Sequence, residues 1–282
     1  MRIEPTATTL GAVVTDIDLR EEITTADADQ LRAALDDRGV LAFPGQHLED
    51  DDLVRVGRIW GDPYLHPITE LLGSDEAVGV IVNDGDRPAA EVGELGFHTD
   101  YTYNHEIPDV ALLRSVVAPP FGGNTVWADT RAAARGLDPA MRAQLAGMTA
   151  YHHVEEGMLE ALRARYDAET VARFDQRFGD GQRHPVLAVH PRTQDEVLFV
   201  NWGFTRHLIG RPEGDGLLDE LFAVFGDPAI QFEHSWTEGD LVIWDEHRTV
   251  HRGPYDFGTH RRELHRCTVG RHVPTAAAKL AV

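Results

Sequence analysis

The stretch FHTDYTY, residues 97–103, alternates polar side chains with bulkier ones, which is typical of a β-strand. Residues two apart on a strand point to the same side, so this pattern brings His98 and Asp100 together. Burying an imidazole and a carboxylate at one interior point costs free energy unless both have a partner. A metal ion is such a partner, because two histidines and one carboxylate form the facial site of non-haem Fe(II) enzymes that use O₂.

Such a site needs a second histidine from a distant segment. The C-terminal part of the chain offers His234, His247, His251, His260, His265 and His272. His247 and His251 have the i,i+4 spacing of a zinc-binding helix, but their segment follows a predicted strand and lacks the glutamate of H-E-x-x-H. The residues alone leave the choice of the third ligand open.

The segment RRELHRC, residues 261–267, places two arginines on one face of a predicted strand. Arg262, Leu264 and Arg266 share that face, and Cys267 lies on the other face. A buried guanidinium needs an anionic partner, and no acid shares its face of this strand. Because arginine binds carboxylates with two hydrogen bonds, the pattern predicts an anionic small molecule here. Cys267 is expected to be a packed core thiol rather than a nucleophile.

Many short β-segments with turn signals run along the chain, at 11–19, 40–45, 78–83, 109–119, 122–129, 185–190, 197–202, 240–246 and 262–270. Helical spacing is found over 24–39, 48–63, 131–148, 155–178 and 216–228. This order predicts a mainly β protein with helices, a jelly roll that forms one domain over residues 1–282. A helical insert over about 130–182 interrupts the strands, and this insert and the loop 84–96 are expected to be lids.

The net charge of −21 comes from 47 acidic and 26 basic residues and disfavours binding to nucleic acid or to an anionic membrane surface. No apolar run approaches the roughly 20 residues that span a bilayer, and the start of the chain does not resemble a signal peptide. With Cys267 as the only cysteine, no intrachain disulfide can form. We therefore expect a soluble cytoplasmic protein with a small-molecule substrate and no nucleic-acid or membrane partner.

These segments together resemble the Fe(II)- and 2-oxoglutarate-dependent dioxygenases of the taurine dioxygenase and 2,4-D dioxygenase group, the TauD/TfdA family. The resemblance covers nearly the whole chain and includes GAVVTDIDL, GVLAFPGQ, FHTDYTY, GGNTVWAD, LFVNWGFT and GDLVIWDEHRTVHRG. It implies a double-stranded β-helix fold, with Fe(II), 2-oxoglutarate and O₂ as cofactor and co-substrates. The activity it implies is hydroxylation of a small anionic substrate, a sulfonate or carboxylate, with release of succinate and CO₂.

The resemblance also assigns the site residues. In this family the H-x-D pair and a late histidine bind the iron, which implies His98, Asp100 and His251 as the metal ligands and catalytic residues. Arg262 lies eleven residues after His251, as the family pattern requires, and matches the arginine that binds the distal carboxylate of 2-oxoglutarate. Thr125, in the GGNTVW turn, matches the threonine that assists it.

Arg266, fifteen residues after His251, matches the arginine that binds an anionic group of the substrate. Four further positions match the family's substrate pocket: His66, Tyr101, Tyr103 and Phe204. Arg266 could instead pair with an acid from another strand, and the two tyrosines could instead pack against the helical insert.

The chain departs from the family pattern at three places. The usual WDNR before the late histidine is WDEH, residues 244–247, and Glu94 stands at an asparagine-like position before the H-x-D pair. The taurine-type pocket is also less polar where Tyr101 and Tyr103 stand. His247 is expected at the rim of the site or behind its ligands, and YHHVEE (151–156) is expected to be an exposed helix start. The presence of Asp100 disfavours halogenation. The altered pocket leaves desaturation or ring formation in a biosynthetic pathway as an alternative outcome. In another class, the alternatives are a zinc hydrolase and a non-catalytic ligand-binding jelly roll. Family members often form dimers or tetramers, so a homodimer or homotetramer is expected.

Overall fold

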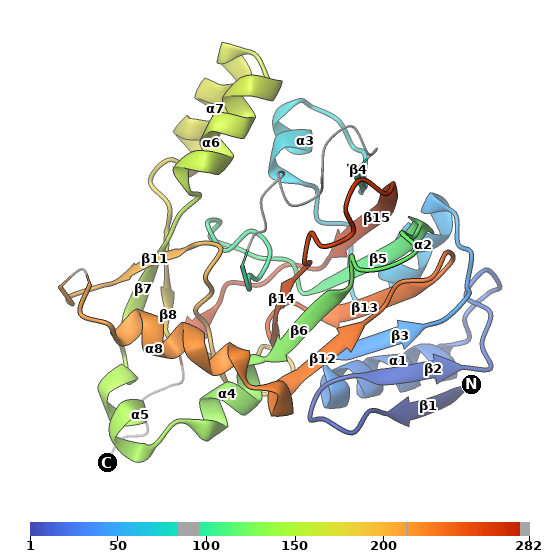
Figure 1. The fold of residues 1–282 in the computed structure, drawn as a ribbon, viewed down its shortest axis with the longest axis horizontal. Coiled ribbons are helices and arrows are strands. Elements are labelled where there is room, and N and C mark those ends of the chain that lie inside the picture. Colours follow the sequence, from blue (N-terminus) through green and yellow to red (C-terminus); the bar gives the residue numbers. More distant parts are fainter. Residues whose placement is uncertain (84–95, 213, 277–282) are drawn as a thin grey trace.

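A seven-stranded sheet dominates the computed structural model, which describes residues 1–83, 96–212 and 214–276 (Figure 1). Its neighbouring strands are antiparallel except for the parallel pair of β2 and β3. In spatial order the strands are β1 (Arg2–Pro5), β2 (Ala12–Thr15), β3 (Val40–Phe43), β13 (Leu241–Asp245), β5 (Val110–Val117), β15 (Arg262–Val269) and β4 (Val78–Asn83).

Three smaller sheets complete the β-structure that the structure describes. The first consists of β12 (Gln231–His234), β6 (Thr125–Asp129) and β14 (Thr249–Arg252). The second consists of β11 (Thr205–Leu208), β7 (Thr149–His152) and β8 (Gln182–Pro185). The third consists of β10 (Glu196–Leu198), β9 (Leu187–Val189) and β16 (Thr275–Ala276).

The helices lie between and around these strands (Figure 1). They are α1 (Thr25–Arg38), α2 (Asp50–Gly57), α3 (Pro67–Leu71), α4 (Thr130–Gly136), α5 (Pro139–Leu145), α6 (Glu156–Arg165), α7 (Ala168–Phe178) and α8 (Leu217–Ala223), with 3₁₀ turns at Val224–Gly226 and Pro228–Ile230. The predicted ends of α1 are confirmed: Thr24 accepts a hydrogen bond from the Asp27 N–H, and Gly39 ends the helix with φ of 68°. No helix in these described ranges is long and apolar enough to cross a membrane.

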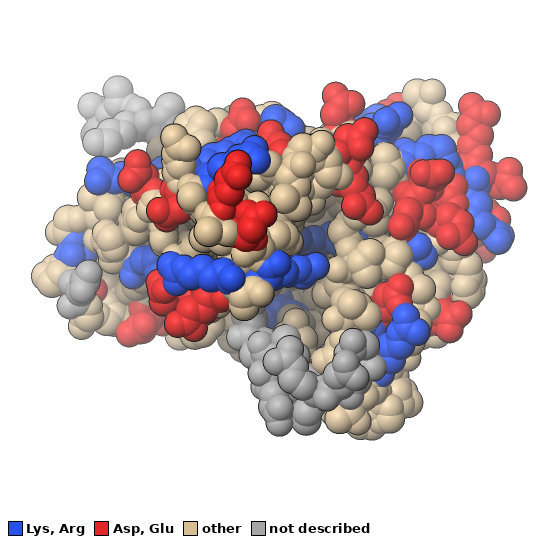
Figure 2. All heavy atoms as spheres, turned by 90° about the horizontal axis from the view of Figure 1, so that it is seen from above, with Lys and Arg blue, Asp and Glu red and all other residues tan. Residues whose placement is uncertain are grey.

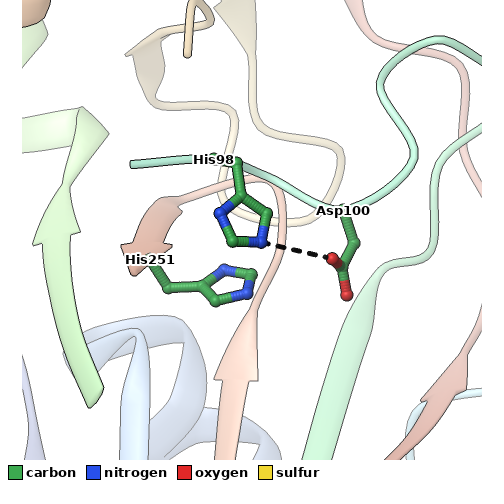
Figure 3. Close-up of side chains that lie close together, drawn as sticks. All are labelled: His98, Asp100 and His251. Atoms are coloured by element: carbon green, nitrogen blue, oxygen red, sulfur yellow. Dashed lines mark ion pairs between the residues drawn. The ribbon is translucent and has the colours of Figure 1, made fainter. Parts of the chain in front are cut away.

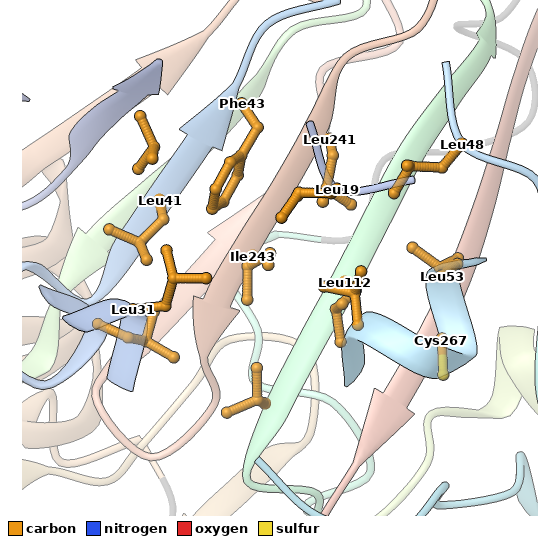
Figure 4. Close-up of a cluster of buried hydrophobic side chains, with 14 of the residues drawn as sticks. Leu19, Leu31, Leu41, Phe43, Leu48, Leu53, Leu112, Leu241, Ile243 and Cys267 are labelled. Atoms are coloured by element: carbon orange, nitrogen blue, oxygen red, sulfur yellow. The ribbon is translucent and has the colours of Figure 1, made fainter. Parts of the chain in front are cut away.

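Side chains alternate between the two faces of the large sheet, as strand geometry requires. On one face, Leu41 and Ile243 pack with Leu31 of α1 and Leu53 of α2 (Figure 4). Each fully buried leucine or isoleucine contributes about 1.5–3 kcal/mol to folding. On the other face, Trp244 packs with Trp127 of β6, so the second core joins the large sheet to the β12–β6–β14 sheet. The predicted site lies beside this second core.

Three local predictions were wrong. FHTDYTY is not a strand: only His98 pairs, in an isolated bridge, and the chain then turns, with Tyr101 at φ of 57°. The insert is also not purely helical, because Thr149–His152 forms the central strand β7 of a sheet. His152 is accordingly buried at the end of β7, whereas YHHVEE was expected to be an exposed helix start. The predicted lid loop 84–96 lies almost entirely outside the described residues.

Candidate active site

His98 and His251 are held together by their own backbones. The His98 N–H donates to the His251 carbonyl at 2.9 Å, and the His251 N–H donates to the His98 carbonyl at 2.7 Å. This pairing attaches the turn after His98 to β14 and brings both rings to one side (Figure 3). Asp100, placed by the turn rather than by strand alternation, points its carboxylate toward the same spot. The ligand atoms of the three residues lie within 4.8 Å of one another.

The three side chains suit a divalent metal. The His98 Nδ1 lies 2.9 Å from the Gly96 carbonyl, so it carries the hydrogen and leaves Nε2 free as a ligand atom. That Nε2 is 3.8 Å from Asp100 Oδ1, too far for a hydrogen bond and wide enough for a bridging ion. The buried His251 Nδ1 has no hydrogen-bond partner. Burial lowers the pKa of both histidines, which keeps the rings neutral, as metal binding requires.

Arg266 contacts the carboxylate of Asp100. Its Nη1 donates to Asp100 Oδ2 at 2.8 Å, and its Nη2 donates to the hydroxyl of Tyr101 at 2.7 Å. Although burial opposes ionisation, Arg266 and the neighbouring histidines hold the pKa of Asp100 below its ordinary value. The ion pair considered as an alternative for Arg266 is therefore present, and its acid is one of the predicted metal ligands.

Glu246 is a neighbour of the site that sequence reasoning did not assign. Its side chain is fully buried and accepts hydrogen bonds from the Asp100 backbone N–H at 3.0 Å and from the Trp244 indole at 2.8 Å. Burial and the Asp100 carboxylate raise the pKa of Glu246 well above its ordinary value, which favours its neutral form. The departure from WDNR to WDEH was the available signal for this residue.

A cavity of about 180 Å³ extends from the two histidines to Arg262 and Thr125. Arg262 is buried, its Nε has no hydrogen-bond partner, and no carboxylate of the described residues forms an ion pair with it. Burial lowers the pKa of this guanidinium, which favours an anionic partner. The Thr125 hydroxyl accepts a hydrogen bond from the Trp236 indole at 2.9 Å, so its own hydrogen is free to donate into the cavity.

Arg262, Leu264 and Arg266 all line this cavity, which confirms the predicted parity of β15. Cys267, on the opposite face, is fully buried in the core beneath α2, and burial raises the pKa of its thiol to about 12. The prediction of a packed core thiol is confirmed.

A second cavity, of about 390 Å³, lies on the other side of Arg266. His66 and Tyr101 line it, and the ring of His66 meets the Tyr101 ring edge-on at 5.5 Å. Arg165 of α6 also lines it, a basic residue of the helical insert that sequence reasoning missed. Figure 2 looks onto the face that carries α3, α6 and α7, and basic atoms are visible in the hollow near its centre.

The other two predicted pocket residues lie deeper. Phe204 is buried, with its ring 6.2 Å from that of His98, so it forms part of the wall beside the metal ligand. Tyr103 contacts Phe204 and two phenylalanines of α7, Phe174 and Phe178, at ring distances of 5.3–6.1 Å. It therefore packs against the helical insert, which was the alternative considered for it, and contact between Tyr103 and substrate stays a prediction.

His247 does not lie at the rim of the site. Its side chain is 3% exposed and contacts Asp109 at 3.0 Å. It directly follows Glu246, which accepts the Asp100 N–H, so it lies behind the ligands, the other alternative expected for it.

The model of the taurine catabolism dioxygenase TauD, TfdA family matches residues 2–268. The chain belongs to this family. It is 31% identical to an alpha-ketoglutarate-dependent sulfate ester dioxygenase of Pseudomonas putida, over 96% of this chain and 90% of that protein. It is 30% identical to an alkylsulfatase of Acinetobacter baylyi, over 95% of this chain and 84% of that protein.

Among solved structures, AAD-2 in complex with Mn(II) and N-oxalylglycine superposes with a TM-score of 0.79 at 25% identity, over 98% of this chain and 99% of the other. The predicted jelly-roll fold is confirmed by this likeness. The TauD/TfdA protein described here is a non-haem iron oxidoreductase that depends on 2-oxoglutarate, with Fe(II) as cofactor and O₂ as the second co-substrate.

Proposed function

We propose that His98, Asp100 and His251 bind the iron, that Arg262 and Thr125 bind the distal carboxylate of 2-oxoglutarate, and that the enzyme hydroxylates a small anionic substrate with release of succinate and CO₂. One observation carries the proposal: a buried arginine without an acidic partner in the described chain shares a cavity with two of the three ligands. A zinc hydrolase or a simple binding module would have no use for that arginine.

The substrate proposal rests on the second cavity. Arg266 borders both cavities, and Arg165 and His66 line the outer one, so an anionic group bound there would lie next to the metal ligands. The two relatives named above are a sulfate ester dioxygenase and an alkylsulfatase. We therefore propose alkyl sulfates and sulfonates as the first substrates to examine, with aryloxyalkanoates as the second class.

Each residue of the proposed site would have a distinct role in the reaction. Bound Fe(II) supplies O₂ activation, which couples loss of CO₂ from 2-oxoglutarate to oxidation of the substrate. Arg262 would fix the co-substrate by two charge-assisted hydrogen bonds, with Thr125 as a third donor. Arg266 would hold Asp100 in its orientation through Nη1 and present positive charge to the outer cavity. Tyr101, whose left-handed backbone costs about 1 kcal/mol or more, orients Arg266 through its hydroxyl.

A succinate-release assay tests the proposal. Wild-type protein with Fe(II), 2-oxoglutarate and O₂ is screened against alkyl sulfates, alkanesulfonates and aryloxyalkanoates. We expect at least one of these classes to stimulate succinate release, and we expect Arg262→Ala to lose that stimulation. The neighbouring exposed Arg261, which pairs with Glu263, provides the matched control Arg261→Ala, which should behave as wild type. Succinate release that is equally low with and without every substrate would contradict the substrate proposal.

Four further predictions belong to this proposal. We infer that residues 1–282 form one catalytic domain and that the insert at about 130–182 acts as a lid over the outer cavity, since Arg165 and Tyr166 of that insert line it.

We also infer a cytoplasmic enzyme that forms a homodimer or homotetramer. Size-exclusion chromatography with light scattering tests the assembly.

A further inference from the structure

A second group of metal-ligating side chains lies apart from the active site. It consists of Asp109, just before β5, His247, in the turn between β13 and β14, and His272, after β15. Their ligand atoms all lie within 4.8 Å of one another. The three residues come from segments far apart in the chain, with Asp109 138 residues from His247 and 163 residues from His272.

The backbone ties these segments together where the side chains meet. The Asp109 N–H donates to the Val269 carbonyl at 2.9 Å, and the Asp109 carbonyl accepts from the Glu246 N–H at 3.0 Å. His272 pairs with Ile107 through two hydrogen bonds of 3.0 and 3.1 Å. The backbone of the cluster is therefore held in place by hydrogen bonds between these segments.

Gly270 makes room for the Asp109 carboxylate. A Cβ at position 270 would lie 2.3 Å from Asp109 Oδ2, and the φ of 70° at this residue also favours glycine. Because any side chain at position 270 would meet the carboxylate, the close approach of β15 to Asp109 depends on this glycine.

The ionisation states suit a metal. Both rings face a single oxygen: Asp109 Oδ1 lies 3.0 Å from His247 Nε2 and 2.6 Å from His272 Nδ1. Although burial opposes ionisation, the hydrogen bonds from the histidines hold the pKa of Asp109 below its ordinary value. Burial lowers the pKa of His247, so its ring is neutral at pH 7. A buried carboxylate beside a neutral imidazole gains a positive partner when a divalent cation binds.

We propose that Asp109, His247 and His272 form a second metal site that takes a borderline divalent cation, Zn²⁺ above all, apart from the iron centre. Two imidazole nitrogens and one carboxylate oxygen are a usual zinc ligand set, at bond lengths of about 2.0–2.2 Å. In a tetrahedral site those lengths place ligand atoms about 3.3 Å apart. When the ion enters, the 3.0 Å contact with His247 therefore opens by about 0.3 Å and the 2.6 Å contact with His272 by about 0.7 Å. The His272 side chain is 52% exposed, which gives the ion a path and leaves the fourth position to water.

A metal ion bound at the second site would stabilise the positions of the iron ligands indirectly. Glu246, adjacent to His247, accepts the backbone N–H of Asp100, and His251 lies four residues farther along the same turn and strand. An ion on His247 therefore anchors the turn that positions two of the proposed iron ligands. The position of His247 is an arginine in the family motif WDNR, and arginine pairs with a carboxylate but does not bind a cation. The second site thus depends on the departure to WDEH.

Equilibrium dialysis of the metal-free protein against Zn²⁺ alone, followed by elemental analysis, tests the proposal. Wild type is expected to bind about two zinc ions per chain, since the iron ligands also bind zinc. His98→Ala/Asp100→Ala removes the first site and is expected to keep one ion. His272→Asn is also expected to keep one ion, and combining all three substitutions is expected to leave none.

Two further variants separate metal ligation from structural damage. His272→Cys replaces one zinc ligand by another at a half-exposed position, so it is expected to retain the second ion that His272→Asn loses. His234→Asn breaks a different histidine–aspartate pair, His234 with Asp240 at 3.1 Å, and is expected to keep both ions. If wild type binds one ion, and that ion is lost in His98→Ala/Asp100→Ala but kept in His272→Asn, the second site is overturned and the iron site is supported. If that one ion is instead kept in His98→Ala/Asp100→Ala and lost in His272→Asn, the second site is supported and the proposed iron site is not.

Discussion

Two clusters in this chain contain the same ligand types, two histidines and one aspartate, but in different surroundings. In the cluster of His98, Asp100 and His251, the ring of His98 stays 3.8 Å from the carboxylate, which is bound by Arg266 instead. In the cluster of Asp109, His247 and His272, both rings contact the carboxylate directly at 2.6–3.0 Å. The first is preorganised to receive an ion, whereas the second must open slightly.

The larger difference is what lies next to each cluster. The first opens into a cavity that ends at the buried Arg262, and a second cavity lies across Arg266. The second cluster is fastened by backbone hydrogen bonds to Val269 and Ile107 and opens toward solvent at His272. Identical ligands therefore predict a metal, but the neighbouring cations and cavities decide whether the metal is catalytic. We expect chemistry at the first cluster and stabilisation at the second.

The largest effect is expected for Asp100→Ala. Substrate-stimulated succinate release should fall by more than about 100-fold, because even residues behind metal ligands contribute about 10- to 100-fold. The zinc that depends on His272 should remain bound, as elemental analysis would show. An Asp100→Ala variant with activity within tenfold of wild type would contradict the claim that only the first cluster is catalytic.

Arg262→Ala is expected to raise the KM for 2-oxoglutarate by about 10- to 100-fold, since a hydrogen-bonded charge pair contributes about 1.5–3 kcal/mol. The measurement is succinate release at saturating substrate over a range of 2-oxoglutarate concentrations. Arg261→Ala serves as the control and should leave this KM unchanged. An unchanged KM in Arg262→Ala would mean that the cavity serves another ligand.

Arg266→Ala is expected to lower substrate-stimulated turnover by about tenfold or more, because it removes charge-assisted hydrogen bonds. The KM for 2-oxoglutarate should change much less than in Arg262→Ala, since Arg266 lies between the two cavities. Kinetics in which the substrate and 2-oxoglutarate are varied separately would distinguish the role of Arg266 from that of Arg262. If Arg266→Ala lost substrate-stimulated turnover and affinity for 2-oxoglutarate equally, the roles of Arg262 and Arg266 would be exchanged.

The smallest effect is expected at the second cluster. Saturating Zn²⁺ should raise the melting temperature of His98→Ala/Asp100→Ala by about 5 °C, as binding at 100 times the dissociation constant stabilises by about 2.7 kcal/mol. Adding His272→Asn should abolish that rise. In an otherwise wild-type chain reconstituted with Fe(II), His272→Asn should keep turnover within about twofold, because its site supports the iron ligands only indirectly. Differential scanning fluorimetry and the succinate assay provide the two measurements.

The parts that could be predicted from sequence depend on short-range rules. The period of two on a strand put Arg262 and Arg266 on one face of β15 and Cys267 on the other, as the structure has them. The convergence of His98 and Asp100 was also predicted, but for the wrong reason. A turn after an isolated bridge brings Asp100 to the ring of His98, and no strand continues through FHTDYTY.

The parts that sequence could not provide depend on long-range pairing. Thr149–His152 looked like part of a helical insert, because nothing local shows that β8 and β11 would pair with it. The contact of Asp109 with His247 and His272 depends on which strands lie side by side, and no spacing rule spans 138 or 163 residues. The choice of Asp100 as the acid that pairs with Arg266, 166 residues away in the chain, has the same origin.

The most direct test of the central claim is an anaerobic titration of the protein with Fe(II) and 2-oxoglutarate, followed by visible absorption. If the co-substrate binds the metal held by His98, Asp100 and His251 while Arg262 holds its far carboxylate, a weak charge-transfer band should grow to about one equivalent of 2-oxoglutarate. The band should persist in Arg261→Ala and in His272→Asn and should be lost in Arg262→Ala at the same concentrations. A folded wild-type protein that shows no band, or an Arg262→Ala variant that titrates as wild type does, would contradict the claim.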